Sequence, residues 1–473
     1  MAVDPLAIGA GGADTAPSSQ SMRIETLISS PPGAFLVLAW IGVMTILQLM
    51  RQPGTPAWDH LWAEDGGVFL SDALGQPSLT TLGHPSAGYL QVAPRLLAGI
   101  TAAFPLGWAA LLLSFGSALL VACLSAYAYF ASSSLFRGQW ARILLAGLLV
   151  LLPATAFETN ASAANLHWYL IFTCFLVFVA RPRSPAAVAL GAIIALAAAL
   201  SDPLAGLLLP LALLQAVHIR NWRGWMAPVV FALGLVAQLV MAVLPSPPQQ
   251  VAGTARAADL PGIYALRVTG SFLVGDRHLD FFWIKFGWVF SYSSFVLVAL
   301  LLVYGMLKSE KRSRFYLVVS FAYSTLFLAI PLMVRGTDGF LDQNAFSLNG
   351  SRYTVVPILF LVVGFLLVLD RPDPRVPVTA WSALQCSFML FTFALVMVNY
   401  SNVSVRSPAQ SWRAGVAAAH ERCLTKSETN RKLELQQTFS PGIAERNAAD
   451  VAIFIAPPSW AVVTKCGRVL RDT

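Results

Sequence analysis

Long apolar stretches without charge constrain this chain more than any other feature of its sequence. An α-helix must run for about 20 apolar residues to cross a hydrocarbon layer of ~30 Å. Runs that reach or approach this length lie at 33–50, 107–131, 140–157, 166–180, 184–200, 203–217, 224–244, 286–307, 315–334, 353–369 and 376–399. Only 11% of residues are charged, against roughly 25% in soluble domains. We therefore expect an all-α polytopic membrane protein with about 11 transmembrane helices.

The basic residues predict how these helices are oriented. Short cytoplasmic loops of membrane proteins hold an excess of Lys and Arg. With a cytoplasmic N-terminus, each even-numbered connection is short and basic; these connections hold Arg137, Arg181, Arg220, Lys308 and Arg371 among others. The odd-numbered connections 51–106, 245–285 and 335–352 are long and polar. The formal net charge of +8 is then explained by cytoplasmic loops, and no nucleic-acid partner is expected.

The segment Gly88–Phe104 tests this count of spans. It is apolar, but Arg95 lies in its middle, and a guanidinium at mid-bilayer costs at least ~3 kcal/mol. Inserting the segment would also reverse the orientation of every later loop. We expect an amphipathic helix at the outer interface instead.

The two ends of the chain differ from its centre. Residues 1–32 are rich in Ala, Gly, Ser and Pro without the apolar core of a signal peptide, so a disordered cytoplasmic tail is expected before a membrane domain at 33–399. Residues 400–473 are polar, with a strand-like run at Asp450–Ile455, and should form a small extracytoplasmic tail domain. Its cysteines, Cys423 and Cys466, could form a disulfide outside the cytoplasm, contributing ~3–4 kcal/mol. The alternatives are two unpaired thiols or, with His420, a metal site.

An acidic pair follows the first apolar run. Glu64 and Asp65 stand among tryptophans that favour the membrane–water interface. Carboxylates beside lipid should have raised proton affinity, and each could act as a general base or bind a divalent cation such as Mg or Mn. Gly66 and Gly67 would let the backbone bend toward a cleft. Alternatively, Asp65 caps a helix over Val68–Leu74.

Further polar groups lie on the same expected side. Glu158, Asn165 and His167 share one outer turn and could line a polar pocket, although His167 could equally be an interfacial histidine. Asp202 is placed to cap the following helix.

Two arginines could contact phosphate. Arg352 stands where the chain re-enters lipid, and a guanidinium there can make bidentate hydrogen bonds to a lipid phosphate or pyrophosphate. A snorkelling anchor is the alternative. Arg95 could act in the same way.

This layout resembles the GT-C class of integral-membrane glycosyltransferases, and in particular an uncharacterised bacterial branch near it. The resemblance lies in the cytoplasmic N-terminus, about a dozen helices, and a long first outer loop with an acidic motif, here Glu64-Asp65. The segments Asn165–Tyr169 and Gly350–Tyr353 also resemble that branch. The likeness covers the whole chain in layout and three short motifs in sequence.

The resemblance implies transfer of a sugar from a polyprenyl-phosphate donor to a cell-envelope glycan or lipid acceptor, at the outer face of a bacterial inner membrane. It makes Asp65 the base, Glu64 its partner or a metal ligand, and Arg352 or Arg95 the phosphate contact. The other residues expected to bind substrate are Tyr353, His167, Asn165 and Glu158. The tail is smaller than the acceptor-binding domain of several such enzymes, which leaves the acceptor open.

Two other functions compete with this one. A transporter or flippase of a lipid-linked saccharide is the first, but transporters place ionisable residues near the midplane, and here nearly all charges lie at span ends. The second is a scaffold, or an acyltransferase-like enzyme of cell-envelope assembly.

Overall fold

The computed structural model describes residues 33–76, 78–243, 253–344, 350–370, 377–404, 406–436 and 449–472. The expected tail at 1–32 lies outside these residues. Met1–Trp40 group apart from Ile41–Thr473. The described part of the first group begins helix α2, and the contacts reported below lie within the second.

Every apolar run predicted from the sequence forms a helix, since a helix satisfies all backbone hydrogen bonds within the segment. These helices are α2 (Ala34–Met50), α6 (Ala109–Ala131), α7 (Gln139–Leu151), α8 (Leu166–Val179), α9 (Pro185–Ser201), α10 (Leu209–His218), α11 (Trp222–Val243), α14 (Asp276–Lys308), α15 (Lys311–Arg335), α16 (Val355–Leu369) and α17 (Val378–Val398). In the described residues, 6 helices are long and apolar enough to cross a membrane. The prediction of an all-α polytopic membrane protein is confirmed at this level.

The start of α14 departs from the sequence prediction. Residues 276–285 were expected in an outer loop, but the helix begins at Asp276 and is broken at Gly287, where φ is 51° and ψ is −132°. Glycine has no Cβ and adopts this backbone conformation at little cost. The apolar run at 286–307 predicted the second part of α14, whereas the residues from Asp276 to Lys285 gave no such signal.

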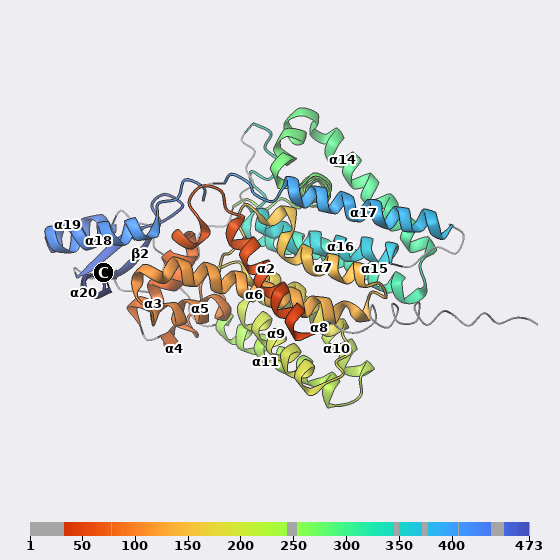
Figure 1. The fold of residues 1–473 in the computed structure, drawn as a ribbon, viewed down its shortest axis with the longest axis horizontal. Coiled ribbons are helices and arrows are strands. Elements are labelled where there is room, and N and C mark those ends of the chain that lie inside the picture. The colour runs from red at the N-terminus through yellow and green to blue at the C-terminus, as the bar shows by residue number, and fades with distance from the viewer. Residues whose placement is uncertain are drawn as a thin grey trace, which may run out of the picture. The chain divides into compact units, whose positions relative to one another are not determined.

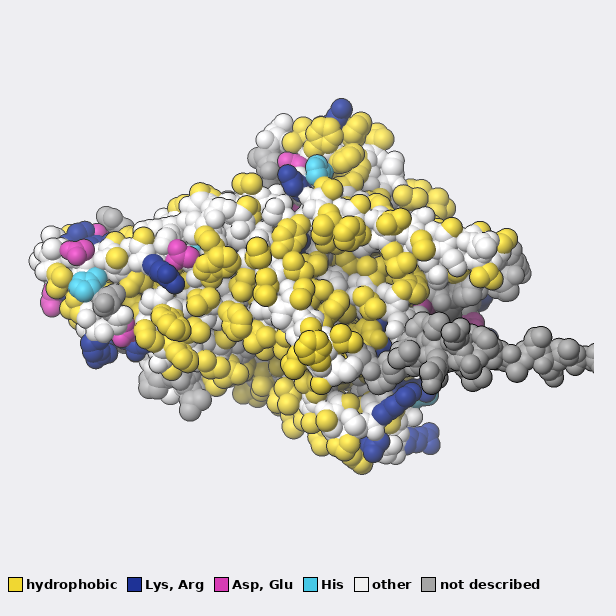
Figure 2. Space-filling model, viewed as in Figure 1, with side chains coloured by type: hydrophobic (Ala, Val, Ile, Leu, Met, Phe, Trp, Pro, Cys, Tyr) yellow, Lys and Arg dark blue, Asp and Glu magenta, His cyan; other side chains and the backbone are white. Residues whose placement is uncertain are grey.

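The helices expose apolar side chains on a broad face. Over α6, α9 and α11 the surface is largely hydrophobic, and the visible charged side chains lie at its margins (Figure 2). Ile193, Leu233 and Leu239 are 64%, 63% and 66% exposed. An exposed apolar surface of this extent is typical of contact with lipid.

Turns that the sequence assigns to the cytoplasm contact one another. The backbone N–H groups of Arg137 and Gly138 donate to the carboxylate of Asp370, at 2.6 and 2.8 Å. Arg312 donates to the carbonyl oxygen of Ser134 at 2.8 Å. These bonds join the α6–α7 turn to the end of α16 and the start of α15.

Turns that the sequence assigns to the outer face also contact one another. The buried Arg51, just after α2, donates to the carbonyl oxygens of Leu152 and Tyr400 at 2.8 and 2.6 Å. It also donates to the Thr155 hydroxyl at 2.6 Å. One guanidinium thereby ties together the ends of α2, α7 and α17.

The first long loop and the tail fold against each other. The loop contains η1 (Ala57–Asp59), η2 (Asp65–Leu70), α3 (Ser71–Gly75), α4 (Ser78–Thr81) and α5 (Val92–Ala102). The tail contains α18 (Trp412–Thr425), α19 (Glu428–Gln436), β1 (Asp450–Phe454), β2 (Ala461–Lys465) and α20 (Cys466–Asp472). The strands pair antiparallel with Asp450 opposite Lys465, and β2 packs on α3 and η2 (Figure 1). The tail therefore forms one structure with the first loop.

A disulfide joins Cys423 to Cys466, with their Cα atoms 5.5 Å apart. It connects α18 to the start of α20, directly after β2. The tail thus has a covalent link between its helical part and its hairpin.

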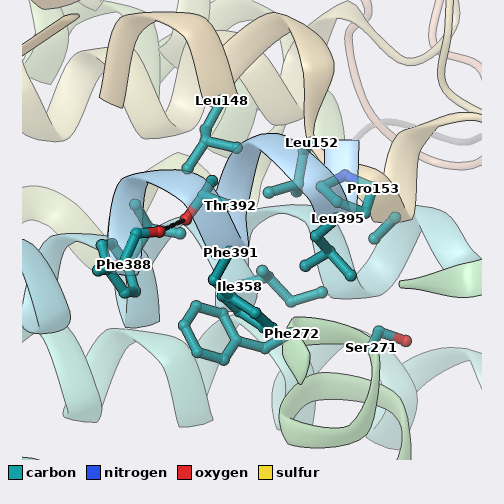
Figure 3. Close-up of a pocket in the computed structure, with 12 residues that line it drawn as sticks. Leu148, Leu152, Pro153, Ser271, Phe272, Ile358, Phe388, Phe391, Thr392 and Leu395 are labelled. Atoms are coloured by element: carbon teal, nitrogen blue, oxygen red, sulfur yellow. Dashed lines mark hydrogen bonds between the residues drawn. The ribbon is translucent and has the colours of Figure 1, made fainter. Parts of the chain in front are cut away.

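Between α7, α16 and α17 lies a small cavity of about 20 Å³. Leu148, Ile358, Phe391 and Leu395 are among the apolar residues that line it (Figure 3). A cavity of that volume holds little more than one water molecule, so it is too small for a sugar or a lipid headgroup.

Candidate functional site

Asp65 is held by the turn that precedes α8. Its Oδ1 accepts hydrogen bonds from the backbone N–H of Ala164 at 2.7 Å and from the Ser162 hydroxyl at 3.4 Å. Asp65 is the first residue of the π-helical turn η2, and no side chain caps that turn. The alternative in which Asp65 caps a helix is therefore wrong, and its carboxylate instead joins the first long loop to the turn before α8.

Gly66 and Gly67 allow the tail to approach η2 closely. A Cβ on Gly66 would lie 2.6 Å from Ile455 Cδ1, and one on Gly67 would lie 2.6 Å from the Trp460 ring. Neither glycine has a positive φ, so the expected bend is not their role. Small residues are needed here because the tail hairpin packs directly on the backbone that carries Asp65.

Arg406 of the tail fixes the turn opposite Asp65. Its guanidinium is 1% exposed and donates to the carbonyl oxygens of Glu158 and Asn160 at 3.3 and 2.8 Å. Its Nε donates to Nε2 of His60 at 3.2 Å. His60 Nδ1 lies 2.9 Å from the carbonyl oxygen of Pro56, so Nδ1 carries the proton and Nε2 accepts. Burial, together with the charge of Arg406, lowers the pKa of His60 to about 4.

Glu158 and Asn165 support the site from within the protein. Glu158 is 2% exposed, and its Oε2 accepts from the Ser351 hydroxyl at 3.2 Å and from the Arg352 N–H at 3.0 Å. Asn165 is buried, and its amide donates to the Ser162 hydroxyl at 3.0 Å. These bonds position the loops around Asp65 and Arg352; that Glu158 and Asn165 also contact substrate stays a prediction.

Arg352 and Tyr353 keep accessible surface at the start of α16. The Arg352 side chain is 32% exposed, and its Nη1 lies 3.7 Å from Glu158 Oε1. The guanidinium lies over the Tyr353 ring, 5.3 Å from its centroid. Glu158 belongs to the turn before α8, whose Ala164 N–H bonds Asp65. This brings two segments far apart in the sequence to the same region.

His167 pairs with Asp202 beside the same turn. His167 Nδ1 lies 2.8 Å from the carbonyl oxygen of Ala164, so it carries a proton, and Nε2 lies 3.4 Å from Asp202 Oδ2. Burial raises the pKa of Asp202 to about 7, which favours a proton held between the two groups. Asp202 Oδ1 also accepts from the Leu204 N–H at 2.8 Å, so the predicted cap is confirmed. Ala164 thus contacts both Asp65 and His167.

Tyr89, Arg335 and Arg406 were missed by sequence reasoning. Tyr89 is within electrostatic range of Asp202, Arg335 and Arg352. Tyr89 and Arg335 stand in or beside loops predicted to lie outside, which is the only signal that could have found them. Nothing in the spacing of the tail's charges distinguishes Arg406.

Arg95 is not available to a substrate phosphate. Its side chain is 1% exposed and its Nη1 lies 2.9 Å from Asp72 Oδ2, with Asp72 equally buried. The guanidinium also lies over the Phe69 ring, 5.5 Å from its centroid. The prediction of a phosphate contact is corrected, since Arg95 instead fixes α5 to η2 and α3.

The electrostatics suit Asp65 to accept a proton. Burial raises its pKa to about 6, Glu64 adds to the rise, and the Ala164 N–H and Arg406 oppose it. The carboxylate is then largely ionised at neutral pH and more basic than an ordinary aspartate. Within the described residues, no group of three or more His, Cys, Asp or Glu side chains could hold a metal ion.

No family model matches the chain, and no curated protein matches it. The structure is similar to that of arabinofuranosyltransferase AftD from mycobacteria, with a TM-score of 0.42 and 14% sequence identity. The similarity covers 85% of this chain and 29% of AftD, so the chain spans less than a third of that protein's length.

Proposed function

We propose that this protein transfers a sugar from a polyprenyl-phosphate donor to a cell-envelope acceptor at the outer face of a bacterial inner membrane. In this proposal eleven helices cross the membrane, the N-terminus lies in the cytoplasm, and the site lies on the opposite side. It is supported by one observation above the others: Asp65 and His167 meet at Ala164, and the same turn carries Glu158, which accepts a hydrogen bond from the Arg352 N–H. A basic carboxylate, a proton-holding pair and a guanidinium thereby share one region.

The reaction assigns a separate task to each group. Asp65 accepts the proton of the acceptor hydroxyl, whose oxygen forms a bond to the anomeric carbon of the sugar. The bond between that carbon and the donor phosphate oxygen breaks, and the electron pair leaves with the phosphate. Arg352 stabilises the charge that develops on the leaving phosphate. Glu158 holds Arg352 in place through its backbone and side chain.

The remaining groups are suited to hold the sugar. Tyr353 offers a half-buried ring on which the sugar would pack, and the buried His167–Asp202 pair would act through the turn that carries Ala164. A divalent cation such as Mg or Mn would be held by Asp65, Glu64 and the donor phosphate, because Mg²⁺ commonly takes one or two carboxylates together with substrate phosphates. It would supply positive charge at the leaving group.

The Asp65→Asn variant tests this proposal in purified protein supplied with radiolabelled polyprenyl-phosphate sugars and envelope extract. General-base catalysis contributes on the order of 10² to 10⁴ in rate, so transfer should fall by that factor while expression and thermal unfolding persist. Asp59→Asn is the matched control, since Asp59 lies in the same loop and its carboxylate, among the described residues, accepts only from the N–H of Arg413 in the tail. Full transfer by Asp65→Asn would overturn the proposal, as would movement of the lipid-linked sugar without chemical change, which identifies a flippase.

A further inference from the structure

A second cavity lies at the other ends of the helices that carry the candidate site. Its volume is about 440 Å³. From His167 to Phe178 along α8 is about 17 Å at 1.5 Å per residue, and Phe178 lines this cavity. Likewise α15 carries Arg335 at one end and Lys311 at the other. The cavity is therefore separate from the candidate active site.

The cavity has an apolar wall and a cationic rim. Phe178, Leu211, Leu214, Ile219 and Phe315 supply much of the apolar lining. Exposed basic side chains complete it, namely Arg181, His218, Lys311 and Arg312. The lining residues include no Asp or Glu in the part of the chain that the structure describes. In Figure 2, Lys and Arg side chains gather close to α10. An apolar wall next to unneutralised positive charge suits an amphiphile with an anionic head.

One buried side-chain oxygen on the wall, that of Gln215, receives no hydrogen bond from the described residues. Gln215 is 5% exposed, and its Nε2 donates to the carbonyl oxygens of Val177 and Ala180 at 2.7 and 3.1 Å. Its Oε1 accepts no hydrogen bond from the described residues. A buried carbonyl oxygen without a donor costs free energy, and a hydroxyl of a bound headgroup would supply that donor.

The rim cations differ in how they are engaged. Arg181 Nη2 lies 2.9 Å from His218 Nε2, and Arg312 donates to the carbonyl oxygen of Ser134. These contacts hold two guanidinium groups at the rim without neutralising their charge. Lys311 is exposed and pairs with no acidic group in the described residues. Guanidinium groups fixed in this way suit the oxygens of a phosphate.

We propose that this cavity binds an anionic phospholipid, with its phosphate at Arg181, Lys311 and Arg312 and an acyl chain along Phe178, Leu214 and Phe315. A polyhydroxyl headgroup such as glycerol would place a donor toward Gln215. Binding is independent of the proposed reaction. With the proposed topology, the bound lipid would belong to the cytoplasmic leaflet.

Native mass spectrometry of the purified full chain tests this site with phosphatidylglycerol, phosphatidylcholine of the same acyl chains, and inorganic phosphate. Each Lys or Arg near anionic lipid contributes ~1 kcal/mol, or about fivefold in affinity. The variant R181Q/K311Q/R312Q should therefore bind phosphatidylglycerol on the order of 100-fold more weakly. Lys311→Gln alone, which disturbs no internal contact, should lose about fivefold.

The matched control is R183Q/R220Q/R314Q, which removes the same charge from the turns around the cavity without changing a residue that lines it. It should retain affinity within about twofold, since these side chains do not line the cavity. Equal binding of the two phospholipids would overturn the proposal. So would an equal loss in both triple variants, or full displacement of the lipid by millimolar inorganic phosphate.

Discussion

The charged side chains near the two ends of α8 differ in burial and in the partners they bond. At the His167 end, Asp65, Glu158, Asp202 and Arg406 are buried and bonded to neighbouring loops. At the Arg181 end, the basic side chains are exposed and bond mainly to carbonyl oxygens or to one another. A buried charge requires a fixed set of partners, whereas an exposed charge requires only water. The first end is therefore built as a rigid site and the second as a surface that meets the membrane or its lipids.

Removing Arg406 should produce the largest effect, because three acceptors lose their donor at once. We expect Arg406→Gln to destabilise the protein by about 3–5 kcal/mol, as breaking a buried charge network usually does. Thermal unfolding in detergent measures this loss. Arg314→Gln at the opposite end, whose exposed guanidinium bonds only local carbonyl oxygens, should change stability by less than about 0.5 kcal/mol. Equal losses would remove the distinction between the two ends.

Reducing the disulfide between Cys423 and Cys466 should be the next largest effect. The bridge spans a sequence separation of 43, so its loss should cost about 3–4 kcal/mol in the chain-entropy description. Because the tail packs on η2, the activity should fall together with stability. The double Cys→Ser variant compared with wild type, each with and without reductant, isolates the bridge. An unchanged unfolding temperature would show that the disulfide does not contribute to the stability of the tail.

The packing of the tail on Gly66 should contribute less. Gly66→Ala places a methyl group 2.6 Å from Ile455 Cδ1, and overpacking of this kind costs about 1–3 kcal/mol. Gly83→Ala is the control, because nothing lies within 4 Å of the Cβ it would add. Sugar transfer by the Gly66 variant should fall more than its stability alone explains, since Asp65 is the adjacent residue. Equal behaviour of the two variants would mean that the tail does not position the carboxylate.

The pH dependence should give the smallest effect. Burial raises the pKa of Asp65 to about 6, and only the ionised carboxylate accepts a proton. Transfer should be constant above about pH 7 and fall about tenfold per unit below pH 6. The variant Glu64→Gln should move this inflection down, because Glu64 contributes to the raised pKa. An inflection near pH 4 in the wild type would indicate an exposed carboxylate.

Much of the fold was predictable because each helix must by itself satisfy its backbone in lipid. Each of the eleven apolar runs coincides with a helix, and the acidic pair and Arg352 were chosen from their places beside these runs. The partners of these residues were not predictable. Arg406 bonds carbonyl oxygens that are 248 and 246 residues away in the sequence. The sequence predicted Asp202 as a helix cap, but it could not show that His167 lies beside it. Arg95 was misassigned because nothing in the sequence shows that Asp72, 23 residues away, is buried as its partner.

Sidedness is the claim on which the whole account depends, and thiol labelling in intact cells tests it most directly. In a chain whose free cysteines Cys123, Cys174 and Cys386 are replaced by Ser, single cysteines are placed at the exposed positions Gly83 and Glu310. A membrane-impermeant maleimide should label position 83 in intact cells and position 310 only after permeabilisation. Labelling of position 310 but not of 83 in intact cells would place Asp65 in the cytoplasm and contradict an outer-face glycosyltransferase.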